Sequence, residues 1–255
     1  MTDRPRNSDY NWDGFNPDEY HRHNYVHSVL DEDQQLIRNM HRRNGELGIA
    51  ARSLGKTINI AHGGNFYPDI IGQHLVSDNG IMVCGEYGAQ NIKNIQDTLS
   101  GFRAGANGIW QQFEDHAAAI SPEYHGSLER IGRLGSLAAM NIFTLRKAEY
   151  DAGYTFFGPE SITADMDEWR NATTTFARSV RPGGLVTMAF MMGSEGYDTP
   201  GEFFPAVPIY CDDVAEVLDP WVDMLEVLPI DAERGARPIN GPQYTGIGLA
   251  TGISR

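Results

Sequence analysis

Short apolar runs alternate along this chain with stretches in which apolar residues recur at helical spacing. Residues 57–61 and 80–84 form two such runs, and residues 89–102 follow the second with a helical pattern. This alternation predicts βαβ units and a parallel sheet with helices on its faces. We expect further helices at residues 31–43, 110–120, 122–137, 165–180 and 211–222, and further strands at 138–143, 154–158, 184–192, 224–230 and 244–253.

The order of these elements predicts a doubly wound α/β sheet that can close with an antiparallel strand. No repeat of fixed period and no low-complexity tract occurs, so a single compact domain is the simplest organisation. Within it we expect residues 1–50 to form a lid segment and residues 51–255 to form the ligand-binding domain. Small ligands bind such sheets at the carboxyl ends of the strands, near the point where the strand order reverses.

The charge of the chain restricts its partners. Lys and Arg number 20 against 34 Asp and Glu, a formal charge of −14. An extended phosphate-binding surface needs the opposite excess, so we expect a small-molecule substrate and no nucleic acid. No run of 18 apolar residues occurs, so we expect no membrane-spanning helix.

The two cysteines, Cys84 and Cys211, lie far apart and show no spacing typical of a disulfide framework or a zinc site. We interpret both as core thiols in a reducing compartment. The first 16 residues are polar and lack the apolar core of a signal peptide. These features predict a cytoplasmic protein.

Two loops that follow the first two predicted strands carry the candidate chemistry. The first holds His62, Gly63, Gly64 and Asn65, and adjacent glycines allow a ligand to approach the backbone closely. A plain tight turn is the alternative, since the GxGxxG pattern of dinucleotide enzymes is absent. The second loop begins with Glu86, whose carboxylate offers two acceptor oxygens to a ribose diol. An exposed loop carboxylate is the alternative there.

Four motifs in this order resemble those of a known enzyme family. They are residues 15–20 (FNPDEY) with Asn24-Tyr25, residues 63–68 (GGNFYP), Glu86-Tyr87 with Asn91, and residues 181–184 (RPGG). Together they resemble the S-adenosylmethionine-dependent methyltransferases of the nicotinamide, phenylethanolamine and thioether type, over residues 10–252. Residues 156–163, 204–207 and 244–246 are similar to a bacterial branch of that family.

This resemblance implies a Rossmann-like methyltransferase fold, with a mostly parallel seven-stranded sheet, helices on both faces and an N-terminal helical lid. It implies S-adenosylmethionine as cofactor and S-adenosylhomocysteine as product. Tyr20 would also reach the substrate, and Glu86 would hold the ribose. Carried over by position, the implied cofactor contacts are Tyr20, Tyr25, Asn59, Gly63, Gly64, Tyr67, Glu86, Tyr87, Asn91, Asn141 and Ile142.

The chain departs from the family pattern at the first loop. The family usually opens this motif with an acidic residue and has Gly two positions later, whereas this chain has Asn59 and Ala61, followed by His62. Asn59 brings no negative charge to offset the cofactor's ammonium group. A carboxylate that follows the fifth strand in the amine methyltransferases is matched here by Ala189. An amine of that particular type is therefore not the expected substrate.

Residues on the loops after the fourth and fifth strands are candidates for the substrate chemistry. Methyl transfer is an in-line displacement, so the protein mainly aligns nucleophile and methyl group, with a base where the nucleophile must lose a proton. The catalytic candidates are Glu160 or His62 as base, with Tyr20 beside the substrate. Capping and core packing are the alternative roles of Glu160 and His62. Substrate contacts are expected from Ser161, Glu195, Tyr197, Phe203 and Tyr244.

Three functions fit these features. The first is methylation of a nitrogen or oxygen atom of a specialised metabolite. The second keeps the fold and pocket but performs an internal displacement on a cofactor-derived adduct, with S-adenosylhomocysteine as leaving group. The third is a non-catalytic binding subunit, against which the presence of Glu86 argues. The sequence leaves the acceptor molecule and the oligomeric state open.

Overall fold

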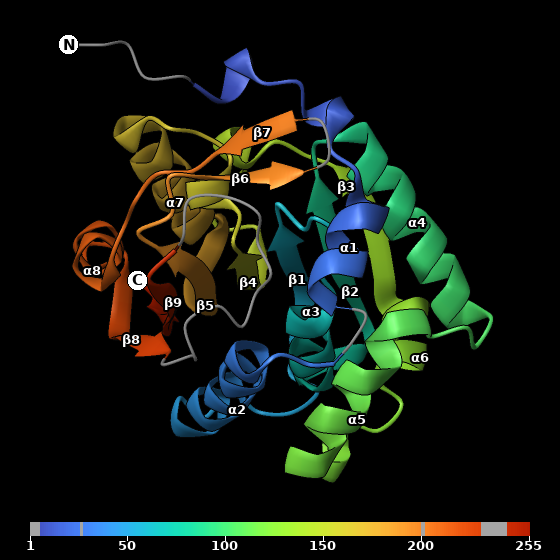
Figure 1. The fold of residues 1–255 in the computed structure, drawn as a ribbon. Coiled ribbons are helices and arrows are strands. Elements are labelled where there is room, and N and C mark those ends of the chain that lie inside the picture. Colours follow the sequence, from blue (N-terminus) through green and yellow to red (C-terminus); the bar gives the residue numbers. More distant parts are fainter. Residues whose placement is uncertain (1–5, 26–27, 200–201, 231–243) are drawn as a thin grey trace.

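The computed structural model describes residues 6–25, 28–199, 202–230 and 244–255. Its centre is a seven-stranded sheet with the strand order β3-β2-β1-β4-β5-β9-β8 (Figure 1). Neighbouring strands are parallel except where β9 lies antiparallel to both β5 and β8. The predicted doubly wound sheet with an antiparallel close is confirmed. The strands are β1 (Leu54–Ile60), β2 (Val76–Glu86), β3 (Gly135–Ala139), β4 (Tyr150–Phe156), β5 (Val180–Met192), β8 (Val222–Ile230) and β9 (Gly246–Ser254).

Helices cover both faces of the sheet, each over its own apolar core. Along β5, Leu185 packs into one core, whereas Val186 and Phe190 pack into the other. A strand buried on both faces has a nearly continuous apolar sequence. One face carries α2 (Asp31–Glu46), α3 (Tyr67–Gly72), α4 (Ala89–Arg103), α5 (Gln111–Ile120) and α6 (Ser127–Leu134), and the other carries α7 (Met166–Ser179) and α8 (Cys211–Leu218). In the described parts of the chain, no helix combines the length and apolar character needed to cross a membrane.

The N-terminal segment has two parts. One covers the carboxyl ends of the central strands, and the other belongs to the apolar core. The covering part contains η1 (Asn7–Asp9), η2 (Trp12–Gly14) and α1 (Pro17–Tyr25). In α2, which lies within the expected lid, Leu36, Ile37 and Met40 are buried in the first core. The cover therefore ends before α2, because the apolar stripe of this helix packs against the rest of the domain.

The chain passes from α6 into β3 without a loop, and earlier than the sequence pattern predicts. The pattern predicts a helix to residue 137, whereas α6 ends at Leu134 and β3 starts at Gly135. A Cβ on Gly135 would lie 2.6 Å from the carbonyl oxygen of Ile131 and 2.7 Å from Leu99, so only glycine fits this junction. The expected bounds are wrong here because apolar residues of a short strand also continue a helical period.

A hairpin of β6 (Gly196–Thr199) and β7 (Glu202–Pro205) follows β5 and has no counterpart among the predicted elements. It lies at the same end of the molecule as the N-terminal segment (Figure 1). Phe204 is buried against Trp12 and Phe15, with ring centroids 5.3 and 5.4 Å apart. The hairpin and the N-terminal segment therefore form one continuous cover.

The start of α7 also holds this cover in place. Asp165 caps the helix, as its position predicts, by accepting from the backbone N–H groups of Asp167 (2.9 Å) and Glu168 (3.0 Å). The Glu168 carboxylate accepts from the N–H of Asn7 (2.8 Å) and from the hydroxyl of Thr163 (2.7 Å). The carboxylate thus ties the N-terminal segment to α7.

We expect Gly135→Ala to lower the free energy of unfolding by about 1–3 kcal/mol, because the added methyl group overpacks the junction. Gly45→Ala is the matched control: Gly45 lies in α2, and no atom lies within 4 Å of a Cβ added there. That change should raise stability by up to about 1 kcal/mol, since Ala is the better helix former. Denaturant unfolding measures both variants, and a Gly135→Ala protein as stable as wild type would contradict the packing described.

Candidate functional site

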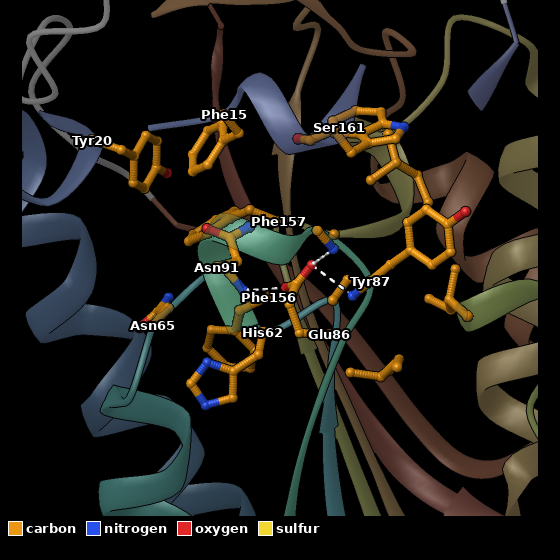
Figure 2. Close-up of a pocket in the computed structure, with 18 of the residues that line it drawn as sticks. Phe15, Tyr20, His62, Asn65, Glu86, Tyr87, Asn91, Phe156, Phe157 and Ser161 are labelled. Atoms are coloured by element: carbon orange, nitrogen blue, oxygen red, sulfur yellow. Dashed lines mark hydrogen bonds between the residues drawn. The ribbon is translucent and has the colours of Figure 1, made fainter. Parts of the chain in front are cut away.

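A cavity of about 660 Å³ lies at the carboxyl ends of β1, β2 and β4. Along the chain β1 is followed by β2 on one side, while β4 lies on its other side, so the strand order reverses here. Doubly wound sheets bind ligands at this position. Figure 2 shows Phe15 and Tyr20 of the cover on the opposite side of the cavity from Glu86 and His62.

Glu86 ends β2 and joins the two loops singled out in the sequence. Its Oε2 accepts from the backbone N–H of Gly63 (2.9 Å), and its Oε1 accepts from those of Tyr87 (2.8 Å) and Gly88 (2.9 Å). A carboxylate has about four acceptor positions. One position therefore remains for a ligand hydroxyl, and a second hydroxyl would displace a loop amide.

The loop after β1 turns through Ala61 with φ at +53°, in the left-handed region. A side chain there costs about 1–2 kcal/mol, which is the physical reason for glycine at this position in the family pattern. Gly158 accommodates the exception, because a Cβ on Gly158 would lie 2.7 Å from the Cβ of Ala61. The methyl group of Ala61 thus fills space that Gly158 leaves.

Aromatic rings form the inner side of the cover. Tyr20 lies 5.5 Å from Phe15 and 6.1 Å from Tyr25 between ring centroids. All three residues line the cavity. Such contacts add to the apolar area that each ring buries, so the cover closes as a packed layer.

His21 docks this layer on the glycine loop. Its Nε2 lies 3.3 Å from the carbonyl oxygen of Gly63. Burial lowers the pKa of His21 to about 4, so a neutral imidazole donates this hydrogen bond at neutral pH. A Cβ on Gly64 would lie 2.6 Å from the imidazole ring. The absence of a side chain at Gly64 therefore allows α1 to pack against this loop.

Glu160, a predicted base, is buried in the short turn after β4. Its Oε1 accepts from the backbone N–H of Met191 (3.0 Å), and its Oε2 has no hydrogen-bond partner among the described residues. Burial raises the pKa of Glu160 to about 8, although the bond from Met191 opposes this rise. The neutral acid predominates at pH 7, and Glu160 does not line the cavity, which together argue against the role of base.

Ser161 and Tyr197 do line the cavity near this acid. The Tyr197 hydroxyl donates to the carbonyl oxygen of Ser161 (3.4 Å), and its ring stacks on Phe204 at 5.6 Å. Burial raises the pKa of Tyr197 well above its usual value. The side chain is therefore a neutral phenol, whose one donor goes to Ser161 and whose oxygen can still accept a hydrogen bond.

Most of the predicted site residues meet at this cavity. Those that line it are Tyr20, Tyr25, His62, Gly63, Glu86, Tyr87, Asn91, Asn141, Ile142, Ser161 and Tyr197. Within the described ranges, the predicted residues that do not line it are Asn59, Gly64, Tyr67, Glu160, Glu195, Phe203 and Tyr244.

Packing by distant segments explains several of these exceptions. Tyr67 stacks on Phe113 at 5.5 Å, and the Tyr244 hydroxyl donates to Glu32 of α2 (2.5 Å). Phe203 and Glu195 are exposed. The aromatic ring of Phe203 and the charge of Glu195 were therefore not sufficient to predict a position in the cavity.

Two residues of the resemblance lie deeper than expected. Asn59 is buried, and its Nδ2 donates to the carbonyl oxygen of Asn65 (3.2 Å) and to Asp69 (2.8 Å). Ala189, matched to a carboxylate after the fifth strand, lies inside β5 opposite Phe156. The match at Ala189 is therefore wrong in position, because β5 continues to Met192.

Three asparagine side chains bring unpaired hydrogen-bonding atoms to the site, and sequence reasoning named only Asn91 among them. Asn24 Oδ1, Asn65 Nδ2 and Asn91 Oδ1 are buried and have no hydrogen-bond partner among the described residues, and all three residues line the cavity. Buried polar atoms are normally paired, so these atoms are available to a polar ligand. Asn24 and Asn65 lie inside motifs of the resemblance, which was the signal that could have identified them.

No protein-family model matches the sequence, and no curated protein matches it. The fold is shared with solved structures. A S-adenosylmethionine-dependent methyltransferase from Aquifex aeolicus is 9% identical, with a TM-score of 0.51, over 94% of this chain and 98% of that one. N-methyltransferase NodS from Bradyrhizobium japonicum WM9 is 13% identical, with a TM-score of 0.50, over 88% and 98%. An O-methyltransferase family protein from Burkholderia thailandensis is also 13% identical at 0.50, over 86% and 56%. The Rossmann-like methyltransferase fold is thereby confirmed.

We expect the pair Ala61 and Gly158 to be energetically coupled. Gly158→Ala should lower the free energy of unfolding by about 1–3 kcal/mol, because its methyl group meets that of Ala61. In an Ala61→Gly background the loss should shrink by at least about 0.5 kcal/mol. Unfolding of the four proteins of this cycle measures the coupling, and strictly additive losses would count against the contact.

We expect Glu160 to make stability fall with rising pH between its ordinary pKa near 4.5 and its value in the fold of about 8. In that window the folded chain keeps a proton that the unfolded chain has released, which costs about 1.4 kcal/mol per pH unit. Glu160→Gln does not titrate and should lack this decline, whereas the exposed control Glu195→Gln should keep it. Thermal or denaturant unfolding across the window measures it, and parallel profiles for wild type and Glu160→Gln would refute the burial argument.

Proposed function

We propose that this protein is a S-adenosylmethionine-dependent methyltransferase that acts on a nitrogen or oxygen atom of a small specialised metabolite and releases S-adenosylhomocysteine. The observation that carries the proposal is the Glu86 carboxylate, held by Gly63, Tyr87 and Gly88 beside a cavity in this fold. The similarity to an N-methyltransferase and to an O-methyltransferase family protein supports the choice of acceptor atoms.

The residues around the cavity fit such a cofactor. Its volume of about 660 Å³ lies within the usual range for small-molecule pockets, about 300–1,000 Å³. The unpaired amide atoms of Asn24, Asn65 and Asn91 offer both donors and acceptors to an amino acid or a nucleoside. Met140 and Ile142 provide an apolar wall for a base. The free acceptor position of Glu86 suits a ribose hydroxyl.

Glu86 and the asparagine amides would hold the cofactor, which would supply a sulfonium methyl group for in-line displacement by an acceptor atom. The protein contributes alignment and exclusion of water. Phe15, Tyr20 and Phe204 pack the cover that excludes water. Tyr20 and Tyr197 line the cavity where the acceptor would lie, and any proton that the acceptor loses leaves without help from Glu160.

The chemistry of the cavity wall supports a proposal for the substrate class. Phe156 and Phe157 line the cavity together with Trp12, Phe15 and Tyr20 of the cover. Aromatic walls favour flat rings and attract cations. The net charge of −14 adds long-range repulsion of anions. A neutral or cationic ring-bearing acceptor fits these walls best.

We expect wild-type protein to bind S-adenosylhomocysteine and S-adenosylmethionine with comparable affinity in calorimetric titration. Glu86→Gln should weaken both by at least about tenfold, because a hydrogen bond to a charged group contributes about 1.5–3 kcal/mol. Glu195→Gln is the matched control, since this exposed residue does not line the cavity, and it should bind as wild type does.

Three outcomes would contradict the proposal. If the protein binds neither ligand, a non-catalytic regulatory role would be favoured. Tight binding of S-adenosylhomocysteine alone would favour the displacement reaction, in which this molecule is the leaving group. Equal affinities of wild type and Glu86→Gln, with both proteins folded by circular dichroism, would remove Glu86 from the site.

A further inference from the structure

Three side chains of metal-binding type converge in the core below the cavity. His62 follows β1, Asp69 lies in α3 and Cys84 lies in β2, with exposed fractions of 2%, 3% and 0%. One donor atom from each residue lies within 4.8 Å of the other two. Three separate elements supply them, so no short sequence spacing reveals the cluster.

Buried polar atoms around this cluster lack hydrogen-bond partners among the described residues: both ring nitrogens of His62, Oδ1 of Asn59 and the hydroxyl of Tyr154. Asn59 and Tyr154 both adjoin Asp69. The Asn59 amide nitrogen lies 2.8 Å from its carboxylate, and that charge adds to burial in raising the pKa of Tyr154. Protein interiors pair nearly all such atoms, and groups left unpaired indicate water or an ion.

The contact between His62 and Asp69 has the length of a hydrogen bond without its geometry. Nε2 lies 3.3 Å from Oδ2, yet this nitrogen makes no hydrogen bond with the described residues. Two ligands of one ion have this relation, because their lone pairs point at the ion. Tetrahedral zinc, with bonds of about 2.0–2.3 Å, separates its donors by about 3.3–3.8 Å. Donors within 4.8 Å of one another need inward shifts of only about 0.5 Å to share such an ion.

The charges in the cluster also favour a dication. Asp69 brings a buried carboxylate to the cluster, and a thiol that coordinates a divalent ion loses its proton. One carboxylate, one thiolate and one dication then sum to zero charge in a low-dielectric core.

We propose that His62, Asp69 and Cys84 bind a divalent metal ion of the zinc class, with a fourth position for water or for Oδ1 of Asn59. Imidazole, thiolate and carboxylate donors together suit Zn²⁺. The Cys84 proton passes to solvent as the sulfur–metal bond forms. His62 also lines the cavity, which gives the ion a route to the site. The bound ion fixes the loop after β1 to α3 and β2, and it removes His62 from the candidates for a base.

The test is Co²⁺ binding to the metal-stripped full-length protein, and it does not depend on cofactor or substrate. We expect one Co²⁺ per chain, a near-ultraviolet charge-transfer band from thiolate to cobalt, and a rise in the thermal midpoint on addition of Zn²⁺. Cys84→Ser should lose the band, and Asp69→Asn should bind at least about tenfold more weakly. Cys211→Ser is the matched control, because the second free cysteine lies on α8 outside the cluster, and it should keep the band.

Two results would overturn the proposal. A wild-type protein that shows neither the band nor stoichiometric metal would assign the unpaired atoms to buried water. A band that survives in folded Cys84→Ser but disappears in Cys211→Ser would place the metal elsewhere. Should Cys84→Ser not fold, His62→Gln should weaken Co²⁺ binding by at least about tenfold while it keeps the thiolate, and the wild-type measurement alone still decides.

Discussion

The buried carboxylate of Glu86 is the interaction on which the site depends. Three backbone N–H groups from two loops converge on it, so neither loop can move without leaving part of a buried charge unsatisfied. Charge-assisted bonds of this kind are among the stronger ones in proteins. The three hydrogen bonds that compensate for the burial of the Glu86 charge thus also fix the two loops that border the cavity. A ligand then meets a surface that is already ordered.

Strain is placed next to this rigid junction. Ala61 and Phe157 both have positive φ, at +53° and +59°, and both line the cavity. Non-glycine residues keep such conformations only where the surroundings over-determine them. Because Gly158 has no side chain, the methyl group of Ala61 has room. The backbone of Phe157 is held by the hydrogen bond from its N–H to the carbonyl oxygen of Ala189 (2.8 Å). The two turns therefore present their side chains to the cavity at fixed positions.

The parts of the fold and site that follow from local chemistry could be predicted from the sequence. The alternation of elements predicts the parallel sheet, and Glu86 and Gly63 end or follow adjacent parallel strands, so they had to lie close together. Tyr67 and Tyr244 could not be placed, because their partners come from α5 and α2 and leave no trace in the local pattern. The hairpin of β6 and β7 was missed for the same reason: it depends on Phe204 packing against the N-terminal segment.

The position of β9 has a consequence for how this chain reaches its structure. β9 comes after β8 in the sequence, yet it lies between β5 and β8 in the sheet. Until β9 inserts, β5 presents an apolar edge from Leu185 to Met192 with unpaired backbone groups. Exposed edges of this kind recruit other chains and lead to aggregation. Substitutions that slow the insertion of β9 should therefore reduce the yield of folded protein, because self-association of the exposed β5 edge competes with insertion.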